Sequence, residues 1–151
     1  MRYTLILTIA ILFFTACKKD KYTTAPQIKF KSISPTDVVG GIGVAAPVLT
    51  ISITDAEGDI GNNGNDTAYL YIKSLLTNDF DSLAFPDLQN ASVKNFKADV
   101  EFSTAGVFKC KPIPGGGIHK DTLYFEVYVK DFAKNKSNVV TTEYPVYFTC
   151  Q

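Results

Sequence analysis

The sequence predicts an all-β protein. Apolar and polar residues alternate with a period of two along several short runs, and Gly, Pro, Asn and Asp separate these runs. The cleanest run is 122–130, whose alternate apolar residues are Leu123, Phe125, Val127 and Val129. Each run has one apolar face and one polar face, which is typical of antiparallel sheets that pack on one side.

Seven strands are expected after residue 26. Their predicted ranges are 27–33, 47–54, 67–75, 97–103, 107–112, 121–130 and 138–149. This pattern predicts a seven-stranded antiparallel β-sandwich of immunoglobulin-like type. Pro145 lies within the last strand, and because proline has no N–H to donate, it favours an edge position or a bulge there. The segment 75–95 is compatible with three alternatives: a long crossover, an extra edge strand, or a short helix around Asp79–Leu83.

Residues 1–16 are predicted to form a cleaved lipoprotein signal peptide. Arg2 supplies a positive charge, and residues 5–14 form an apolar run of about 10 residues, too short to span a bilayer of roughly 30 Å. The residues before Cys17 resemble the bacterial lipobox, although Phe14 stands where Leu is usual. The resemblance implies that Cys17 becomes the first mature residue and carries the lipid. The alternative is an ordinary secretory signal followed by a chance cysteine.

The expected domain organisation follows from this signal. Residues 17–25 are polar without apolar periodicity and predict a lipidated, flexible tether. Fully extended, residues 18–25 reach about 27 Å, so the domain formed by residues 26–151 would lie close to the membrane.

The charge balance gives no electrostatic argument for nucleic acid. The chain has 15 basic and 15 acidic residues, and removal of residues 1–16 would leave a net charge of −1. No nucleic-acid partner is therefore expected. The absence of Trp weakens a case for sugar stacking, although eight Tyr could partly substitute.

Two cysteines remain in the predicted domain. Cys110 and Cys150 are expected to form a disulfide because disulfides persist in exported proteins. This bond would close a loop of about 40 residues and stabilise the fold by roughly 3–4 kcal/mol. The alternative is two buried free thiols. Zinc is not expected, since the chain has one histidine and these two cysteines are predicted to be oxidised.

The loop 55–66 is a candidate calcium site. Its carboxylates are Asp55, Glu57, Asp59 and Asp66, and three Asn and three Gly accompany them in twelve residues. Ca²⁺ takes six to eight oxygen ligands on a flexible scaffold, and glycines let backbone carbonyls turn inward. The alternative is a solvated turn, because Gly, Asn and Asp are also common turn residues.

A second loop supports this candidate. In a Greek-key sandwich, the loop after residue 54 and the loop after residue 130 lie at the same pole, so Asp131 could add a further oxygen. Alternatively, Asp131 and Asn135 shape their own turn. The loop 55–66 does not match an EF-hand, because Ile60 occupies the sixth position, where that motif needs Gly.

Two runs, 51–61 (ISITDAEGDIG) and 121–142 (DTLYFEVYVKDFAKNKSNVVTT), resemble small Bacteroidota lipoproteins that carry an immunoglobulin-like, cadherin-like domain. That family shows an Asp-Gly-Asp-Gly-Asp-like turn and an Asp-x-Ala-Gly-Asn-x-Ser-Asn motif. Here Glu57 keeps a carboxylate in the first motif, and Lys134 replaces the glycine of the second. The resemblance implies a lipid-anchored protein of the cell envelope, at the outer membrane, and does not imply a ligand.

The expected function is a binding or scaffolding module, with a protein or glycan as partner. An alternative is a sugar- or protein-binding accessory subunit of an outer-membrane uptake system, in which tyrosines on the polar strand faces would form the contact. The alternative role for these tyrosines is ordinary packing on the sheet. These tyrosines are Tyr69, Tyr71, Tyr124 and Tyr128. An enzyme is not expected, because nothing near His119, the single histidine, marks a nucleophile, and no Lys-Ser/Thr pair follows Gly115–Gly117.

Overall fold

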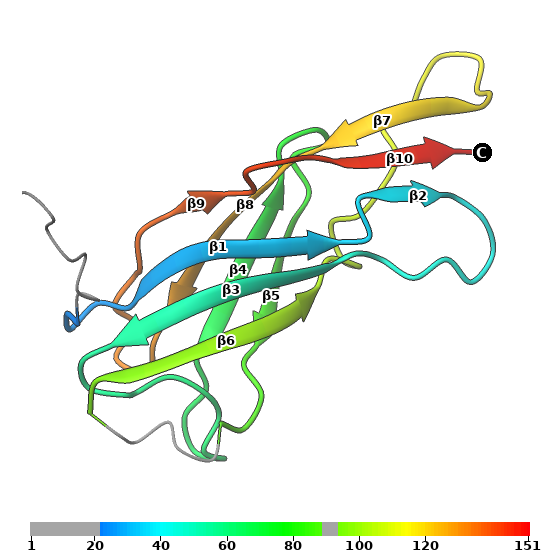
Figure 1. The fold of residues 1–151 in the computed structure, drawn as a ribbon. Helices are drawn as coiled ribbons and strands as arrows, with labels where there is room; N and C mark the ends of the chain where they lie inside the picture. Colours follow the sequence, from blue (N-terminus) through cyan, green and yellow to red (C-terminus); the bar gives the residue numbers. More distant parts are fainter. Residues whose placement is uncertain (1–21, 89–93) are drawn as a thin grey trace, which may run out of the picture.

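The computed structural model describes residues 22–88 and 94–151. The predicted signal peptide and Cys17 lie outside these residues. The described part is all-β, as predicted, with ten strands and no helix (Figure 1). The expected count of seven strands is wrong. Within the two described ranges, no helix is long and apolar enough to cross a membrane.

The strands form three sheets that together make a β-sandwich. The first sheet has the order β1 (Gln27–Ser34), β3 (Val48–Asp55), β6 (Phe96–Ser103). The second has the order β5 (Phe80–Ala84), β4 (Tyr69–Ser74), β8 (Phe125–Lys130), β9 (Val140–Thr141). The third has the order β2 (Asp37–Val39), β10 (Val146–Cys150), β7 (His119–Leu123). All described pairings are antiparallel except β2 with β10, which is parallel.

One apolar core lies between the first and second sheets. The alternation predicted for residues 121–130 is confirmed, since its four apolar side chains are at most 1% exposed. Phe85 and Phe102 meet edge to face across the sandwich, with ring centroids 4.9 Å apart. Each fully buried aliphatic or aromatic side chain contributes about 2–3 kcal/mol. The largest buried side chains include Ile28, Ile33, Leu49, Ile51, Ile53, Leu70, Ile72 and Phe125.

The run predicted as one strand over 121–130 divides at Tyr124. β7 pairs with β10, whereas β8 pairs with β4 and β9, so the chain passes from one sheet to another. The last predicted strand divides in the same way into β9 and β10, and Pro145 lies in the interruption. Pro145 therefore lies between two strands, and the expectation of an edge position or a bulge within one strand is wrong.

Two further predictions are corrected by the structure. Residues 107–112 form no strand, because Val107 and Phe108 donate their N–H groups to the Thr104 carbonyl in a local turn. In segment 75–95, the extra edge strand is the correct alternative, since β5 pairs with β4, and the helix around Asp79–Leu83 is wrong. The short strand β2 was not predicted, because three residues are too few for a period to be recognised.

Asn138 joins the two main sheets at their open edge. Its Oδ1 accepts the Ile28 N–H at 2.8 Å, and its Nδ2 donates to the Ile28 carbonyl at 2.9 Å. The Asn138→Ala variant is expected to lose about 2 kcal/mol of unfolding free energy, because it leaves both backbone groups of a buried residue without partners. Urea denaturation measures this loss. A change below about 0.5 kcal/mol would contradict the bridging role.

Candidate metal site

Strands β3 and β8 end at the same pole of the sandwich, where acidic residues follow or close each strand. β3 ends at Asp55, and Asp131 directly follows β8. Carboxylate oxygens of Asp55, Asp59 and Asp131 all lie within 4.8 Å of one another. The prediction that Asp131 reaches the loop 55–66 is confirmed.

Asp55 is fully buried and has one oxygen without a donor. Its Oδ2 accepts the N–H groups of Gly58 at 2.6 Å and Asp59 at 3.2 Å. Gly58 adopts a φ of 72°, the left-handed conformation that lets the chain fold back over this carboxylate. The other oxygen, Oδ1, is buried without a hydrogen-bond partner, and so is Oδ1 of Asp59. Each of these two carboxyl groups therefore has one buried acceptor oxygen that no donor satisfies.

Backbone contacts tie the loop 55–66 to the loop that follows β8. The N–H of Phe132 donates to the Asp59 carbonyl at 3.0 Å, and the N–H of Ala133 lies 3.4 Å from Asp59 Oδ2. Asp131 accepts hydrogen bonds from the backbone N–H and side-chain Nδ2 of Asn135, at 2.7 and 2.9 Å. The local turn that the sequence left as an alternative thus coexists with the shared site.

Lys134 takes the conformation for which the resembled motif uses glycine. Its φ is 68°, in the left-handed region, and its N–H donates to the Asp131 carbonyl at 3.1 Å. The replacement of glycine by lysine therefore leaves the turn in place, although a side chain with a Cβ is disfavoured in this conformation.

The electrostatics of the site follow from burial. Burial raises the pKa of Asp55 to about 7; the Gly58 and Asp59 N–H groups oppose this rise, and the Asp59 carboxyl adds to it. Burial also raises the pKa of Asp131, and the charges of Asp59 and Glu57 add to that rise while Asn135 opposes it. Like charges this close share a proton or require a cation.

Two of the five predicted ligands lie outside this cluster. Glu57 and Asp66 are exposed, and neither belongs to the group of carboxylates within 4.8 Å. Asp66 instead closes the turn that starts at Asn62, because its N–H donates to Asn63 Oδ1 at 2.7 Å. The sequence alone could not distinguish the acidic residues that join the cluster from those that stay exposed, because all of them lie a few positions apart in the loop.

Comparisons of the chain with protein-family models, with curated proteins and with solved structures give no match. The resemblance to Bacteroidota lipoproteins therefore stays a prediction.

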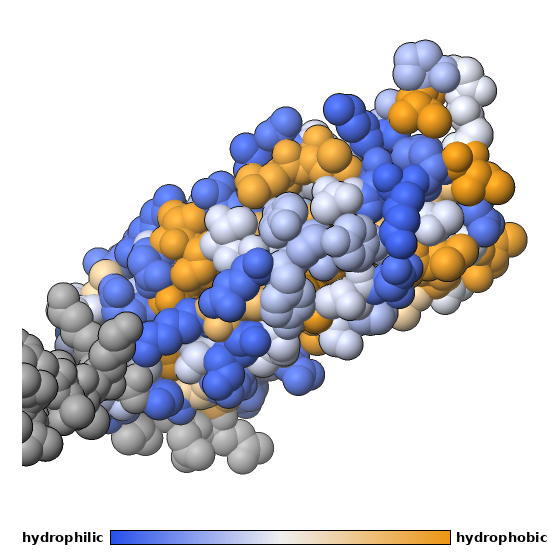
Figure 2. Space-filling view, turned by 45° about the horizontal axis from the view of Figure 1, so that its top comes forward, coloured by the Kyte–Doolittle hydropathy of each residue, from blue (hydrophilic) through white to orange (hydrophobic). Residues whose placement is uncertain are grey.

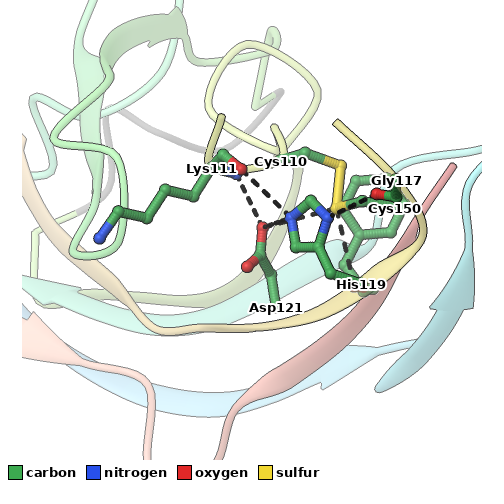
Figure 3. A network of polar contacts seen from close by, with 7 residues as sticks. Cys110, Lys111, Gly117, His119, Asp121 and Cys150 are labelled. Atoms are coloured by element: carbon green, nitrogen blue, oxygen red, sulfur yellow. Dashed lines mark hydrogen bonds and ion pairs between the residues drawn. A yellow bond between two sulfur atoms is a disulfide. The ribbon is translucent and has the colours of Figure 1, made fainter. Parts of the chain in front are cut away.

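The disulfide lies at the other end of the molecule, inside a polar network (Figure 3). Cys110 and Cys150 are bonded, as predicted, with Cα atoms 5.9 Å apart. Asp121 accepts the Lys111 N–H at 2.7 Å, and His119 lies beside both. Sequence reasoning missed this network, because His119 lies outside the strand predicted over 121–130. The observed strand β7 begins at His119, so His119 and Asp121 share a face at i, i+2 spacing.

The tyrosines proposed for sugar contact mostly contact one another. Tyr71 stacks on Tyr128 with centroids 4.7 Å apart and on Phe80 at 5.9 Å. Lys136 Nζ lies 4.0 Å above the Tyr128 ring. Because both faces of the Tyr71 ring are in use, this geometry favours sheet packing over a stacking platform for sugars. Tyr124 stands apart, at the division between β7 and β8.

Exposed apolar side chains gather on β2 and on the loops around the third sheet. They include Val39, Ile42, Val44, Ile113 and Ile118. Figure 1 places the loops after β2 and before β7 at the end of the molecule that also holds the C-terminus. Figure 2 shows apolar groups at that end, whereas polar and apolar residues are mixed over the rest of the visible face.

Proposed function

We propose that this chain is a lipid-anchored binding or scaffolding module of the cell envelope, at the outer membrane. Its immunoglobulin-like sandwich would be stabilised by calcium at the pole formed by Asp55, Asp59 and Asp131. The observation that carries the calcium proposal is the pair of buried Oδ1 atoms, on Asp55 and Asp59, that have no donor. Burying two carboxylate oxygens without hydrogen-bond donors costs folding free energy.

The residues present fit a hard cation. The three carboxylates offer oxygen ligands, and calcium accepts further oxygens from backbone carbonyls and water. When bound, the ion would neutralise the carboxylates. Because Asp55 and Asp59 precede β4 and Asp131 follows β8, the same ion would also hold two loops together.

The position of the tether supports a proposal about which pole of the domain faces the membrane. The N–H of Ala56 donates to the Thr23 carbonyl at 3.2 Å, so the chain enters the sandwich at the pole of the three carboxylates. A lipid on Cys17 would hold this pole toward the membrane. The loops with exposed apolar side chains would then point away from it, and their apolar character favours a protein partner over a glycan.

Calorimetric titration with calcium tests the metal site. We expect one ion to bind per chain, and Asp131→Asn to weaken binding at least tenfold because it removes a charged ligand. Asp66→Asn is the matched control, since it removes a carboxylate from the same region without touching the cluster, and it should bind like the wild type. Equal loss in both variants, or no heat with the wild type, would overturn the site.

Labelling with radioactive palmitate tests the anchor. The wild type should incorporate the label and partition into detergent, and Cys17→Ser should do neither. Equal detergent partitioning of the two forms would end the envelope-anchor proposal while leaving the calcium site untouched.

A further inference from the structure

The disulfide has further metal-binding side chains around it. His119 and Asp121 lie on one face of β7, and Cys150 on β10 is the cross-strand partner of His119 (Figure 3). Cys110 reaches the same place from the loop before β7. Both sulfur atoms and a carboxylate oxygen of Asp121 lie within 4.8 Å of one another. Three donors thus project from one strand pair, and the fourth comes from a loop.

Several acceptors in this network face one another. Asp121 Oδ2 lies 3.4 Å from Cys150 Sγ, and a disulfide sulfur carries no proton to donate. The same oxygen lies 3.4 Å from His119 Nε2. If His119 Nδ1–H donates to the Gly117 carbonyl, 3.1 Å away, Nε2 directs a lone pair toward two oxygens, the Lys111 carbonyl at 3.1 Å and Asp121 Oδ2. After reduction, a cation between the sulfurs would be bound by both of them and by the Asp121 oxygen. The His119 nitrogen lies outside this group of donors and would join it by a small movement of its ring.

We propose that the reduced form of this chain binds Zn²⁺ through Cys110, His119, Asp121 and Cys150. A dithiol reductant would transfer two electrons and two protons to the disulfide, leaving two thiols, and would itself become a disulfide. Zn²⁺ would then displace both thiol protons. Zinc prefers four sulfur, nitrogen and oxygen ligands in a tetrahedral arrangement. A hydrogen bond from Nδ1 to a carbonyl is also the contact that orients a zinc-binding imidazole.

The fold allows the small movement that this requires. Two thiolates on one zinc ion are separate ligands, about 3.8 Å apart, so the two sulfurs must move apart after the bond between them is reduced. Cys110 can supply this movement, because residues 104–118 form no strand. Zinc was excluded from the sequence on the assumption of oxidised cysteines, and reduction removes that condition.

Titration of the reduced chain with Co²⁺ tests the proposal. The purified protein is reduced with a water-soluble phosphine, which takes oxygen from water to become a phosphine oxide. Under anaerobic conditions, we expect one Co²⁺ per chain, the visible bands of tetrahedral cobalt and a thiolate-to-cobalt charge-transfer band. Zn²⁺ should abolish these bands by displacement, and the oxidised protein should show none.

Variants that retain both cysteines distinguish a site that includes His119 and Asp121 from binding by the two thiols alone. His119→Gln and Asp121→Asn can fold with the disulfide intact before reduction, and each should weaken Co²⁺ and Zn²⁺ binding at least tenfold. Asp99→Asn, an exposed carboxylate on β6, is the matched control and should bind like the wild type. The proposal is overturned if no tetrahedral spectrum develops. It is equally overturned if the His119 and Asp121 variants bind as tightly as the wild type, as an unfolded dithiol chain would.

Discussion

At pH 8, saturating calcium is expected to raise the unfolding free energy of the protein by about 3 kcal/mol and its melting temperature by about 10 °C. The free energy corresponds to a calcium concentration of about 100 times Kd. The shift in melting temperature is the one that this free energy produces in a domain of this size. The physical reason is that two buried carboxylate oxygens without donors would gain a cation in the folded state only. Thermal melts in calcium and in a chelator measure the difference.

The size of this calcium effect should depend on pH in a definite direction. Without metal, folded Asp55 keeps its proton up to about pH 7, whereas the unfolded chain loses it near 3.8. The folded state therefore binds more protons between these values, and its stability is full below pH 3.8 and falls as pH rises toward 7. The loss is about 1.4 kcal/mol per pH unit for this one group. Calcium should thus stabilise the protein little at pH 5 and most at pH 8.

The Asp55→Asn variant is the control for this prediction, because removal of the buried carboxylate is expected to stabilise the metal-free protein at pH 8. Its amide oxygen can still accept the Gly58 and Asp59 N–H groups, and its NH₂ can donate to the orphaned Asp59 oxygen. In chelator at pH 8, the variant should be more stable than the wild type and should not respond to calcium. A wild type whose melting temperature is the same with calcium and with chelator at pH 8 would contradict the calcium site.

Replacing both Cys110 and Cys150 by alanine is expected to lower the unfolding free energy by about 4 kcal/mol. The bond closes a loop of 40 residues, and its loss restores the conformational entropy of that loop in the unfolded chain. The loop contains β7 and β8, which belong to different sheets, so the bond stabilises the connection between them. Urea denaturation of the oxidised wild type and the double variant measures the loss.

Chemical reduction of the wild type is the control for this variant. Reduced wild type in a metal chelator should lie close to the double alanine variant, because both lack the cross-link. A loss below about 1 kcal/mol in both proteins would show that the cross-link constrains the unfolded chain far less than its loop length predicts.

Much of the fold could be predicted from local sequence. The alternation in 121–130 correctly assigned the buried face, and the ranges for β1, β3, β4 and β6 are correct to within two residues. A period of two reports which face of a strand is buried, and that preference is local. The same signal was wrong over 107–112. This range ends at Pro112, and its N–H groups are satisfied within a turn and by Asp121.

The sequence by itself determined an all-β chain, the cysteine pair and an acidic loop at the end of a buried strand. Only the tertiary structure decided that Tyr124 divides one run between two sheets, that Glu57 and Asp66 stay outside the acidic cluster, and that His119 lies beside the disulfide. The reason is physical: side-chain periodicity is a property of one strand. Partner strands and the meeting of distant side chains depend instead on hydrogen bonds and packing between segments far apart in the chain.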